Sequence, residues 1–284
     1  ASRRCERTKK LLRLIAKRAA EEGIDVATYS YKTLKEVFAP APTTKDVLAK
    51  AKADNVHFMR LQFTDIDGVA KNVEIPESQF EKALDGEIMF DGSSIDGFSR
   101  IQEADMLARP DPTTFQILPW RGAADGGVAR MFCDIVTPDG TAFDGDPRSV
   151  LRRNLQRAGD LGYTFFVGPE IEFFYFETPT PGERPVPLDQ GGFFDLTTRD
   201  AAGDLRKDTI RKLEQMSIPV EYSFHEDAPS QHEIDLRHTD ALTMADSVMT
   251  FRLVVKEVAA SKGVHVTFMP KPVADLQGSG MHLH

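Results

Sequence analysis

Hydrophobic and polar residues recur along the first half of the chain with the periods of short strands and helices. A stretch of alternating residues, a turn at Asp65-Ile66-Asp67-Gly68 and a second alternating stretch together predict a β-hairpin. The block from Phe90 to Trp120 is rich in Asp, Gly, Ser and Pro, which favours ordered loops over regular structure. The pattern predicts helices over residues 44–53 and 76–84, and strands over residues 56–63, 69–75, 114–118 and 129–135.

The second half of the chain has longer periodic segments. Apolar residues at helical spacing follow Pro147, which suits the first turn of a helix, and a long helical pattern ends at Gly263. Between these two helical patterns lies a strongly aromatic stretch that is typical of a strand. The pattern predicts helices over residues 148–161, 204–216 and 241–262, and strands over residues 163–176, 221–236 (a pair around Pro229), 264–268 and 280–284.

The segments group into two domains behind an N-terminal extension. The sequence Ala39-Pro40-Ala41-Pro42 breaks any preceding helix and predicts a linker. Residues 41–143 are expected to form one small mixed α+β domain, and residues 144–284 a second domain. Residues 1–40 are expected to be an extension of unknown role. Its first 20 residues are basic and helix-prone, and an exposed helix outside the core fold is favoured over a transit peptide.

Composition and charge restrict the class of partner. With 41% hydrophobic and 28% charged residues, the chain resembles an ordinary globular protein, and no apolar run approaches the roughly 20 residues of a membrane span. Residues 1–18 hold eight Lys and Arg and one Glu, so the rest carries a formal charge of −16 within the total of −9. An acidic body argues against nucleic acid as a partner and suits a protein that concentrates cations. Two cysteines, Cys5 and Cys133, are too few for a disulfide framework, which favours the cytoplasm.

Two carboxylates stand at alternate positions of an aromatic segment, Gly168-Pro169-Glu170-Ile171-Glu172-Phe173-Phe174. On a strand, Glu170 and Glu172 lie on the same face, where their like charges repel unless a cation lies between them. Two solvated glutamates would fit the same pattern. Unpaired carboxylates are costly in a buried strand, however, and the aromatic flanks predict such a strand: Phe165, Phe166, Phe173, Phe174 and Tyr175.

A second polar cluster runs from His225 to Glu233, with Glu226 and Glu233 on either side of a turn at Pro229. A hairpin would bring these two carboxylates face to face, although a polar hairpin with solvated charges is the simpler interpretation of this segment alone. Pro229 occupies the place of the second histidine in a His-Glu-x-x-His motif, which disfavours a zinc-peptidase helix.

A third segment, Met269 to His284, carries Gly278-Ser279-Gly280 and two histidines. The glycines allow the backbone to lie against a ligand, and His282 and His284 share one face of the following strand. Four glutamates and one imidazole form an oxygen-rich ligand set, which suits Mg²⁺ or Mn²⁺ better than structural zinc. The sequence has no G-x-x-x-x-G-K-[ST] and no G-x-G-x-x-G motif, so a nucleotide would be held through metals and strands.

In their order and spacing, these three motifs resemble the prokaryotic type I family of glutamine synthetases. Phe63-Thr64-Asp65 and Phe90-Asp91-Gly92-Ser93-Ser94 are similar to that family's Asp loop and D-G-S-S segment. The resemblance extends from about Thr43 to His284, while residues 1–40 have no counterpart. It implies an α+β fold, in which an N-terminal β-grasp domain is followed by an incomplete catalytic α/β domain with a curved antiparallel sheet.

The resemblance also implies a reaction. The family makes glutamine from glutamate, ammonia and ATP through γ-glutamyl phosphate, with two or more Mg²⁺ or Mn²⁺ ions per site. It does so in a cytoplasmic homododecamer whose active sites lie between neighbouring subunits. A carboxylate oxygen is a poor leaving group, so phosphorylation must precede amide formation, and metals neutralise the charge on the transferred phosphoryl group. Glutamate, ammonium, ATP and further copies of the chain are therefore the expected partners.

The resemblance implies metal ligands by position. Glu172, Glu226 and Glu233 match the ligands of one metal. Glu170 and His282 match ligands of the other.

Further positions match substrate contacts of the family. Glu221 and His284 match nucleotide-contacting positions. Gln277 and Gly278 match the loop that holds the amino group of glutamate. Asp65 resembles the aspartate that binds ammonium and takes part in removing its proton, acting in a neighbour's site.

Two features depart from the family's pattern. The family's loop often carries Asn where this chain has Gln277, which leaves the preference for the amine or amino acid open. The chain also begins without Met and stops at His284, before the family's last metal ligand, its phosphate-binding arginines and its flap glutamate. We therefore expect a fragment of a longer enzyme, and we expect the 284-residue chain by itself to lack synthetase activity.

Three alternatives stay open at this point. The first is a ligase of the same superfamily that joins glutamate to a polyamine or another amine. The second is a non-catalytic oligomeric homologue, although a scaffold has little use for an uncompensated acidic cluster. The third is a metal-dependent hydrolase, against which only the context of the phosphate-linked motifs counts.

Overall fold

A computed structural model describes residues 41–284, except residues 96, 98–104, 123–125, 179–181 and 197. Two compact units are distinguished, Ala1–Pro42 and Thr43–His284, and the second is described below. The helix predicted within residues 1–40 and the start of the linker lie outside the described residues. Among the residues that are described, no helix combines the length and the apolar character needed to cross a membrane.

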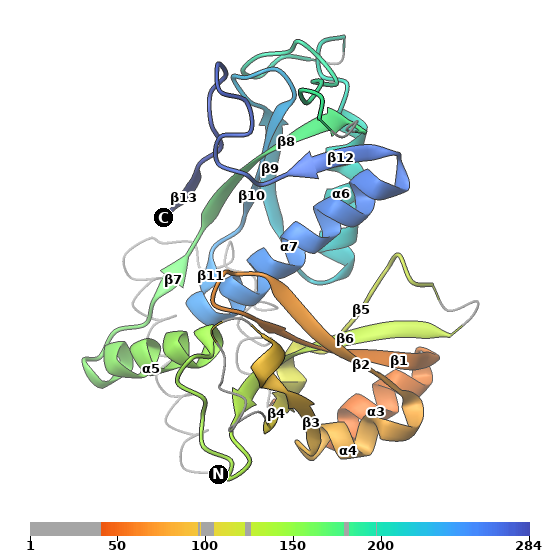
Figure 1. Cartoon of the computed structure of the whole chain (residues 1–284), viewed down its shortest axis with the longest axis vertical. Coiled ribbons are helices and arrows are strands. Elements are labelled where there is room, and N and C mark those ends of the chain that lie inside the picture. Colours follow the sequence, from red (N-terminus) through yellow and green to blue (C-terminus); the bar gives the residue numbers. More distant parts are fainter. Residues whose placement is uncertain (1–40, 96, 98–104, 123–125, 179–181, 197) are drawn as a thin grey trace, which may run out of the picture. The chain divides into compact units, whose positions relative to one another are not determined.

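The first sheet contains the predicted hairpin and is mixed. Strands β1 and β2 pair antiparallel, and β1 runs parallel to β6. The strand order is β2-β1-β6-β4-β3, with β5 also paired to β6 (Figure 1). Its strands are β1 (Val56–Thr64), β2 (Ala70–Pro76), β3 (Ile88–Asp91), β4 (Asp105–Pro110), β5 (Gln116–Ile117) and β6 (Gly127–Val136).

Two helices supply the apolar cover of the first sheet. Helix α3 (Thr44–Ala53) begins with a capping box, in which Thr43 and Asp46 bind each other's backbone N–H. Helix α4 (Phe80–Leu84) follows a 3₁₀ turn at Glu77–Gln79, so the predicted helix over 76–84 is present but irregular at its start. Two further 3₁₀ turns are Gly92–Ser94 and Pro112–Thr114. The core contains Val47 and Ala51 of α3, Phe80 and Ala83 of α4, and Met59 and Leu61 of β1.

The expectation of loops between Phe90 and Trp120 is wrong in part. This block contains β4 and the end of β3, which pair with each other. Met106 and Ala108 of β4 are buried in the first core. Burial against the neighbouring strands therefore outweighs the turn-forming residues that dominate this block.

The second sheet is antiparallel throughout. Its strand order is β12-β8-β10-β9, and β13 pairs with β8 farther along the same strand (Figure 1). Its strands are β8 (Pro169–Glu177), β9 (Val220–His225), β10 (Gln231–Leu236), β12 (Val264–Thr267) and β13 (Met281–Leu283), and a separate short pair is β7 (Phe166–Val167) with β11 (Thr239–Asp240). All of these strands fall within the predicted strand segments or directly next to them.

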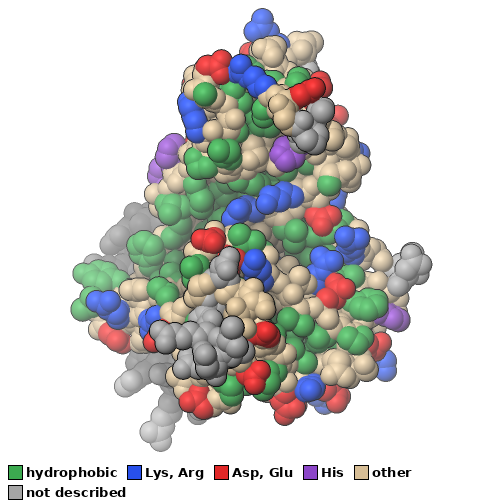
Figure 2. Space-filling view, viewed as in Figure 1, with side chains coloured by type: hydrophobic (Ala, Val, Ile, Leu, Met, Phe, Trp, Pro, Cys, Tyr) green, Lys and Arg blue, Asp and Glu red, His purple; other side chains and the backbone are tan. Residues whose placement is uncertain are grey.

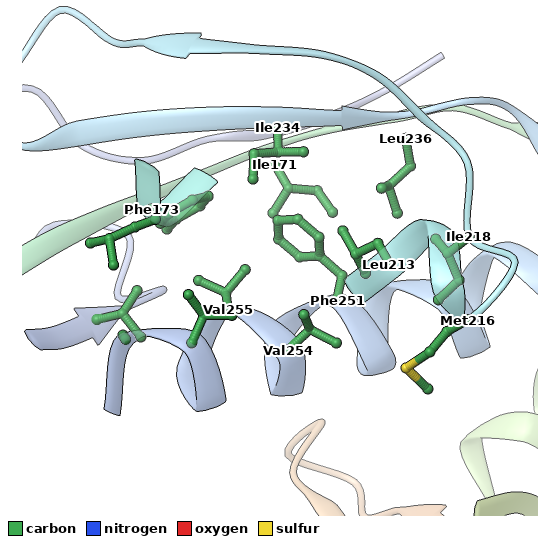
Figure 3. Close-up of a cluster of buried hydrophobic side chains, with 14 of the residues drawn as sticks. Ile171, Phe173, Leu213, Met216, Ile218, Ile234, Leu236, Phe251, Val254 and Val255 are labelled. Carbon is green, nitrogen blue, oxygen red and sulfur yellow. The ribbon is translucent and has the colours of Figure 1, made fainter. Parts of the chain in front are cut away.

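One face of the second sheet packs on helices. The helices are α5 (Pro147–Asp160), α6 (Gly203–Gln215) and α7 (Ala241–Ser261). Figure 3 shows Phe251 and Val255 of α7 directed at the sheet, where they meet Ile171 and Phe173 of β8 and Ile234 of β10. Because side chains alternate along a strand, the residues between these apolar ones lie on the opposite face, away from α7.

The aromatic flanks of β8 behave differently on its two sides. Phe173, Phe174 and Tyr175 have no exposed surface, as predicted. Phe165 and Phe166 are 60% and 56% exposed, so the prediction that they belong to a buried strand is wrong. These two residues precede β8, which begins at Pro169, and they lack the cover that α7 gives to the strand.

A buried ion cluster links the first sheet to α5 and α7. Arg148 of α5 donates hydrogen bonds to Asp246 of α7, at 2.9 Å and 3.1 Å, and to Asp111, at 2.8 Å. It also binds Asp134 of β6 at 2.5 Å. Arg152 binds the same two aspartates, Asp111 and Asp134. Each carboxylate of this Arg148 cluster therefore has a guanidinium partner.

Candidate functional site

The face of the second sheet that points away from α7 is acidic because a three-residue pattern occurs twice. Strand β8 carries Glu170-Ile171-Glu172, and β10 carries Glu233-Ile234-Asp235. The antiparallel register sets Glu172 opposite Glu233 and Glu170 opposite Asp235, with the two isoleucines paired between them on the α7 side. Facing residues on adjacent strands have Cβ atoms about 4.5–5.5 Å apart, so four carboxylates form one group. With Glu226, this group is called the acid face below.

Two histidines of the C-terminal segment hold Glu170. Strand β13 sets His282 opposite Glu170. His282 Nδ1 lies 3.0 Å from Glu170 Oε2, and His284 Nε2 lies 2.9 Å from Oε1. The hydrogen bond from His282 is the main cause that lowers the pKa of Glu170, and His284 adds to it. Glu170 is thus held in its ionised form.

Glu226 lies in the turn between β9 and β10. The turn is closed by the hydrogen bond from the Glu226 N–H to the Gln231 carbonyl at 2.8 Å, and Ser230 adopts a left-handed φ of 57° within it. The turn brings Glu226 to the same cavity of about 590 Å³ as the other predicted metal ligands. That cavity is lined by Glu170, Glu172, Glu226, Glu233 and His282, together with Asp235 and the aromatic residues Phe193, Phe194, Tyr222 and Phe224. The structure therefore brings all five predicted metal ligands together.

The acid face has no basic counterpart. None of the ion pairs among the described residues joins Glu172, Glu233 or Asp235 to a Lys or Arg. Burial raises the pKa of all three carboxyls, and neighbouring carboxylates raise them further. Four glutamates, an aspartate and an imidazole form an oxygen-rich donor set that fits Mg²⁺ or Mn²⁺.

Gln231 joins the acid face to the glycine-containing loop, and the sequence gave no indication of this role. Its side-chain Nε2 donates to Glu172 Oε2 at 2.8 Å and to the Gly278 carbonyl at 3.0 Å. A Cβ at Gly278 would lie 2.5 Å from the Pro270 carbonyl oxygen, and one at Gly280 would lie 3.0 Å from Glu172 Oε1. Glycine is required at both positions for the loop to approach this closely. The neighbouring Gln277 is exposed.

A second cavity of about 460 Å³ adjoins the first. Both predicted nucleotide contacts, Glu221 and His284, line this cavity. Glu170, Tyr222 and Asp235 line both cavities. The two predicted sites are therefore neighbours that share one wall.

Asp65 lies elsewhere, in the turn between β1 and β2, and lines neither cavity. Its carboxylate accepts hydrogen bonds from the N–H groups of Val69 at 2.8 Å and Asp67 at 3.0 Å, and Lys71 Nζ lies 3.2 Å away. Burial alone would raise the pKa of Asp65, but the hydrogen bonds from Val69 and Lys71 outweigh it and hold the pKa below its ordinary range. Within the described part of one chain, Asp65 is not brought to the acid face.

A buried group behind the turn supports the acid face. Asp189, His225 and His232 offer ligand atoms within 4.8 Å of one another. Arg206 Nη1 lies 2.7 Å from His232 Nδ1, and because a guanidinium only donates, Nδ1 accepts and Nε2 carries the proton. A protonated Nε2 has no lone pair for a metal. Asp189 instead accepts from His225 Nε2 at 2.9 Å and from the Ser230 N–H at 2.9 Å, which fixes both ends of the turn that carries Glu226.

The chain matches two family models. Residues 144–284 match the family described as "Glutamine synthetase, catalytic domain", and residues 55–138 match "Glutamine synthetase, beta-Grasp domain". The glutamine synthetase of Halobacterium salinarum is 53% identical over 239 residues, which cover 84% of this chain and 53% of that protein. The glutamine synthetase of Thermus thermophilus is 52% identical over 246 residues, which cover 85% of this chain and 55% of that protein. The chain spans about half the length of the curated relatives it matches.

Solved structures agree with this result. A structure titled as a GmaS/ADP complex is 28% identical, with a TM-score of 0.76 over 84% of this chain and 55% of that one. The cryo-EM structure of Plasmodium falciparum glutamine synthetase has a TM-score of 0.78 over 85% of this chain and 53% of that one; at 22% identity it shows the fold alone. The predicted α+β fold, a β-grasp domain followed by a catalytic domain with an antiparallel sheet, is confirmed.

Proposed function

The chain belongs to the glutamine synthetase family, and we propose that it forms part of an enzyme that joins ammonia to the γ-carboxylate of glutamate, using ATP. One observation carries the proposal. Glutamates from β8, β10 and the β9–β10 turn meet His282 in one cavity, without a Lys or Arg partner among the described residues. Such a donor set is suited to divalent cations, which ATP-dependent phosphoryl transfer requires.

We propose that the acid face holds at least two Mg²⁺ or Mn²⁺ ions, with Glu172, Glu226 and Glu233 around one and Glu170 and His282 around the other. When bound, these ions neutralise the charge that develops on the transferred phosphoryl group. The chain's own contribution is orientation. Gln231 fixes one oxygen of Glu172, and the two histidines fix both oxygens of Glu170.

The 460 Å³ cavity is the proposed nucleotide site, with Glu221 and His284 as contacts. Its shared wall with the acid face would set the nucleotide phosphates beside the metals. The ADP in one related structure supports this assignment. Formation of γ-glutamyl phosphate from glutamate and ATP is the proposed first step.

The loop with Gln277 and Gly278 is the proposed contact for the amino group of glutamate. Its distance from the acid face is set by the hydrogen bond from Gln231 to the Gly278 carbonyl. Asp65 is the proposed ammonium site. Its lowered pKa keeps the carboxylate ionised, which favours ammonium binding and leaves an acceptor for its proton.

Asp65 lines neither cavity of its own chain, so we propose that it acts at the site of a neighbouring copy in a homo-oligomer, of which a dodecamer is the proposed form. The cytoplasm is the proposed location, because Cys133 is a buried free thiol.

Transfer of ¹⁵N from ammonium into the amide of glutamine, followed by NMR, tests the proposal on the intact protein that contains this chain. Glu172→Gln is expected to lower the rate by roughly 100-fold or more, because a metal ligand is lost. Glu214→Gln is the matched control, since Glu214 is exposed at the end of α6, and its rate should stay within about twofold of the wild-type rate. Turnover with putrescine but not with ammonium would replace glutamine synthesis by the polyamine alternative. The 284-residue chain alone is expected to show no turnover.

A further inference from the structure

Asp235 stands on the acid face, yet none of the motifs or family positions above gives it a role. It follows Glu233 by two positions on β10, so both side chains leave the strand on the same face. The register sets it opposite Glu170 of β8. Asp235 is therefore as close to the proposed metals, by its place in the sheet, as the predicted ligands are.

The Asp235 carboxylate is buried and lacks a counterion. The residue is 4% exposed, and its Oδ1 atom makes no hydrogen bond. No ion pair within the described ranges joins it to a Lys or Arg. A buried carboxylate oxygen without a donor is costly unless a cation takes the donor's place.

Asp235 also lies where the two cavities meet. It lines the 590 Å³ cavity with Glu172 and Glu226, and the 460 Å³ cavity with Glu221 and His284. An anionic ligand at this position would hold a cation between the acid face and the phosphates of a nucleotide in the second cavity.

We propose that Asp235 is a further ligand of a divalent cation on the acid face, with Glu170 and Glu233 as its partners. The inference rests on the proposed function and deepens it, because β10 then supplies two ligands. Glu233-Ile234-Asp235 thereby repeats the arrangement of Glu170-Ile171-Glu172, with both acidic positions directed at metal and the isoleucine directed at the core. A fifth carboxylate adds a hard anionic oxygen, the donor that Mg²⁺ and Mn²⁺ prefer.

Binding of Mn²⁺ to the full 284-residue chain, measured from the EPR signal of free Mn²⁺, tests this proposal. Asp235→Asn keeps the side-chain shape and removes the charge. We expect at least about a 10-fold loss of Mn²⁺ affinity or the loss of one bound ion. Asp227→Asn is the matched control, because it makes the same change at an exposed residue of the adjoining turn. Its effect should stay below about threefold, since an exposed charge is screened.

Further variants make each outcome decisive. Asp235→Ser is a second neutral variant with the same expected loss, for use if Asp235→Asn does not fold, as judged by circular dichroism. Wild-type affinity and stoichiometry in the folded neutral variant, or an equal loss in Asp227→Asn, would overturn the role of Asp235. If Glu172→Gln loses Mn²⁺ while Asp235→Asn keeps it, the inference fails and the proposed function stands. If Glu172→Gln binds Mn²⁺ like the wild type, the proposed metal site itself fails.

Discussion

Two groups of buried carboxylates in this chain are built in opposite ways. In the Arg148 cluster, Asp111 and Asp246 each accept a hydrogen bond from the guanidinium within 3 Å. On the acid face, Glu233 and Asp235 are equally buried and have no basic partner among the described residues. Figure 2 shows how little this distinction can be read from the surface, where acidic and basic side chains are scattered over the visible face. The first group is complete within the chain, and the second requires a cation from outside.

The largest effect should come from breaking the balanced group. Arg148→Met leaves three aspartates without their central cation, and we expect the free energy of unfolding to fall by about 3–5 kcal/mol. Urea unfolding followed by circular dichroism measures the change. Arg153→Met is the control, because Arg153 and its partner Asp144 have side chains that are 49% and 95% exposed, and it should cost less than about 1 kcal/mol. A similar loss in both variants would mean that the Arg148 cluster is not special.

The next effect should come from completing the unbalanced group. Mn²⁺ at about 100 times its dissociation constant is expected to raise the free energy of unfolding by about 2.7 kcal/mol. Glu233→Gln should abolish most of this increase, whereas Arg153→Met should keep it. Urea unfolding with and without Mn²⁺ gives the comparison, and an unchanged increase in Glu233→Gln would remove Glu233 from the metal site.

A smaller effect is expected from pH in the absence of metal. Burial, followed by the carboxyl of Asp235 and the charge of Glu172, raises the pKa of Glu233 in the folded state. A raised carboxyl pKa stabilises the fold below the unfolded-state pKa, and this contribution is lost as the pH rises through the folded pKa. Glu233→Gln should therefore match the wild type near pH 4 and exceed its stability by on the order of 2 kcal/mol at pH 8.

Chemical unfolding across that pH range, in EDTA, checks the sign. Asp139→Asn serves as the control, because the pKa of Asp139 is lowered by hydrogen bonds from Thr137 and Thr141, so its loss should destabilise the chain at high pH. A Glu233→Gln gain that did not grow with pH would contradict the proposed electrostatics.

The smallest effect should come from the edge of the balanced group. Arg152 binds Asp111 and Asp134, but its side chain is 41% exposed. Arg152→Ala should cost about 0.5–1 kcal/mol, because water screens the lost charge and Arg148 still pairs both aspartates. A loss as large as that of Arg148→Met, in the same urea experiment, would show that the two arginines act as one unit.

The difference between the two groups also marks what the sequence could and could not predict. Alternation along β8 placed Glu170 and Glu172 on one face, and that prediction of geometry is confirmed. The same rule applied to Glu233-Ile234-Asp235 would have identified Asp235, but Glu233 was considered only as the end of a turn. The roles assigned to these residues remain predictions.

The Arg148 cluster could not be predicted from local pattern. Arg148 and Asp246 are 98 positions apart, and neither residue departs from the composition of an exposed helix face. Strand β4 was missed for a related reason, because its pairing with β3 and β6 decides its conformation. Periodicity predicts elements well where one face is buried along the whole segment, as in α7, and poorly where a short segment depends on distant partners.

The position of β8 in its sheet has a consequence for synthesis of the chain. Each strand that pairs with it in the second sheet, β10, β12 and β13, lies later in the sequence. The strand therefore leaves the ribosome with both edges unpaired, and its aromatic residues make it a template for aggregation. Glu170 and Glu172 interrupt that hydrophobic run with like charges, which act as gatekeepers on the nascent chain. Two residues proposed to bind metal in the finished enzyme would thus protect the unfinished polypeptide before any metal or partner strand is present.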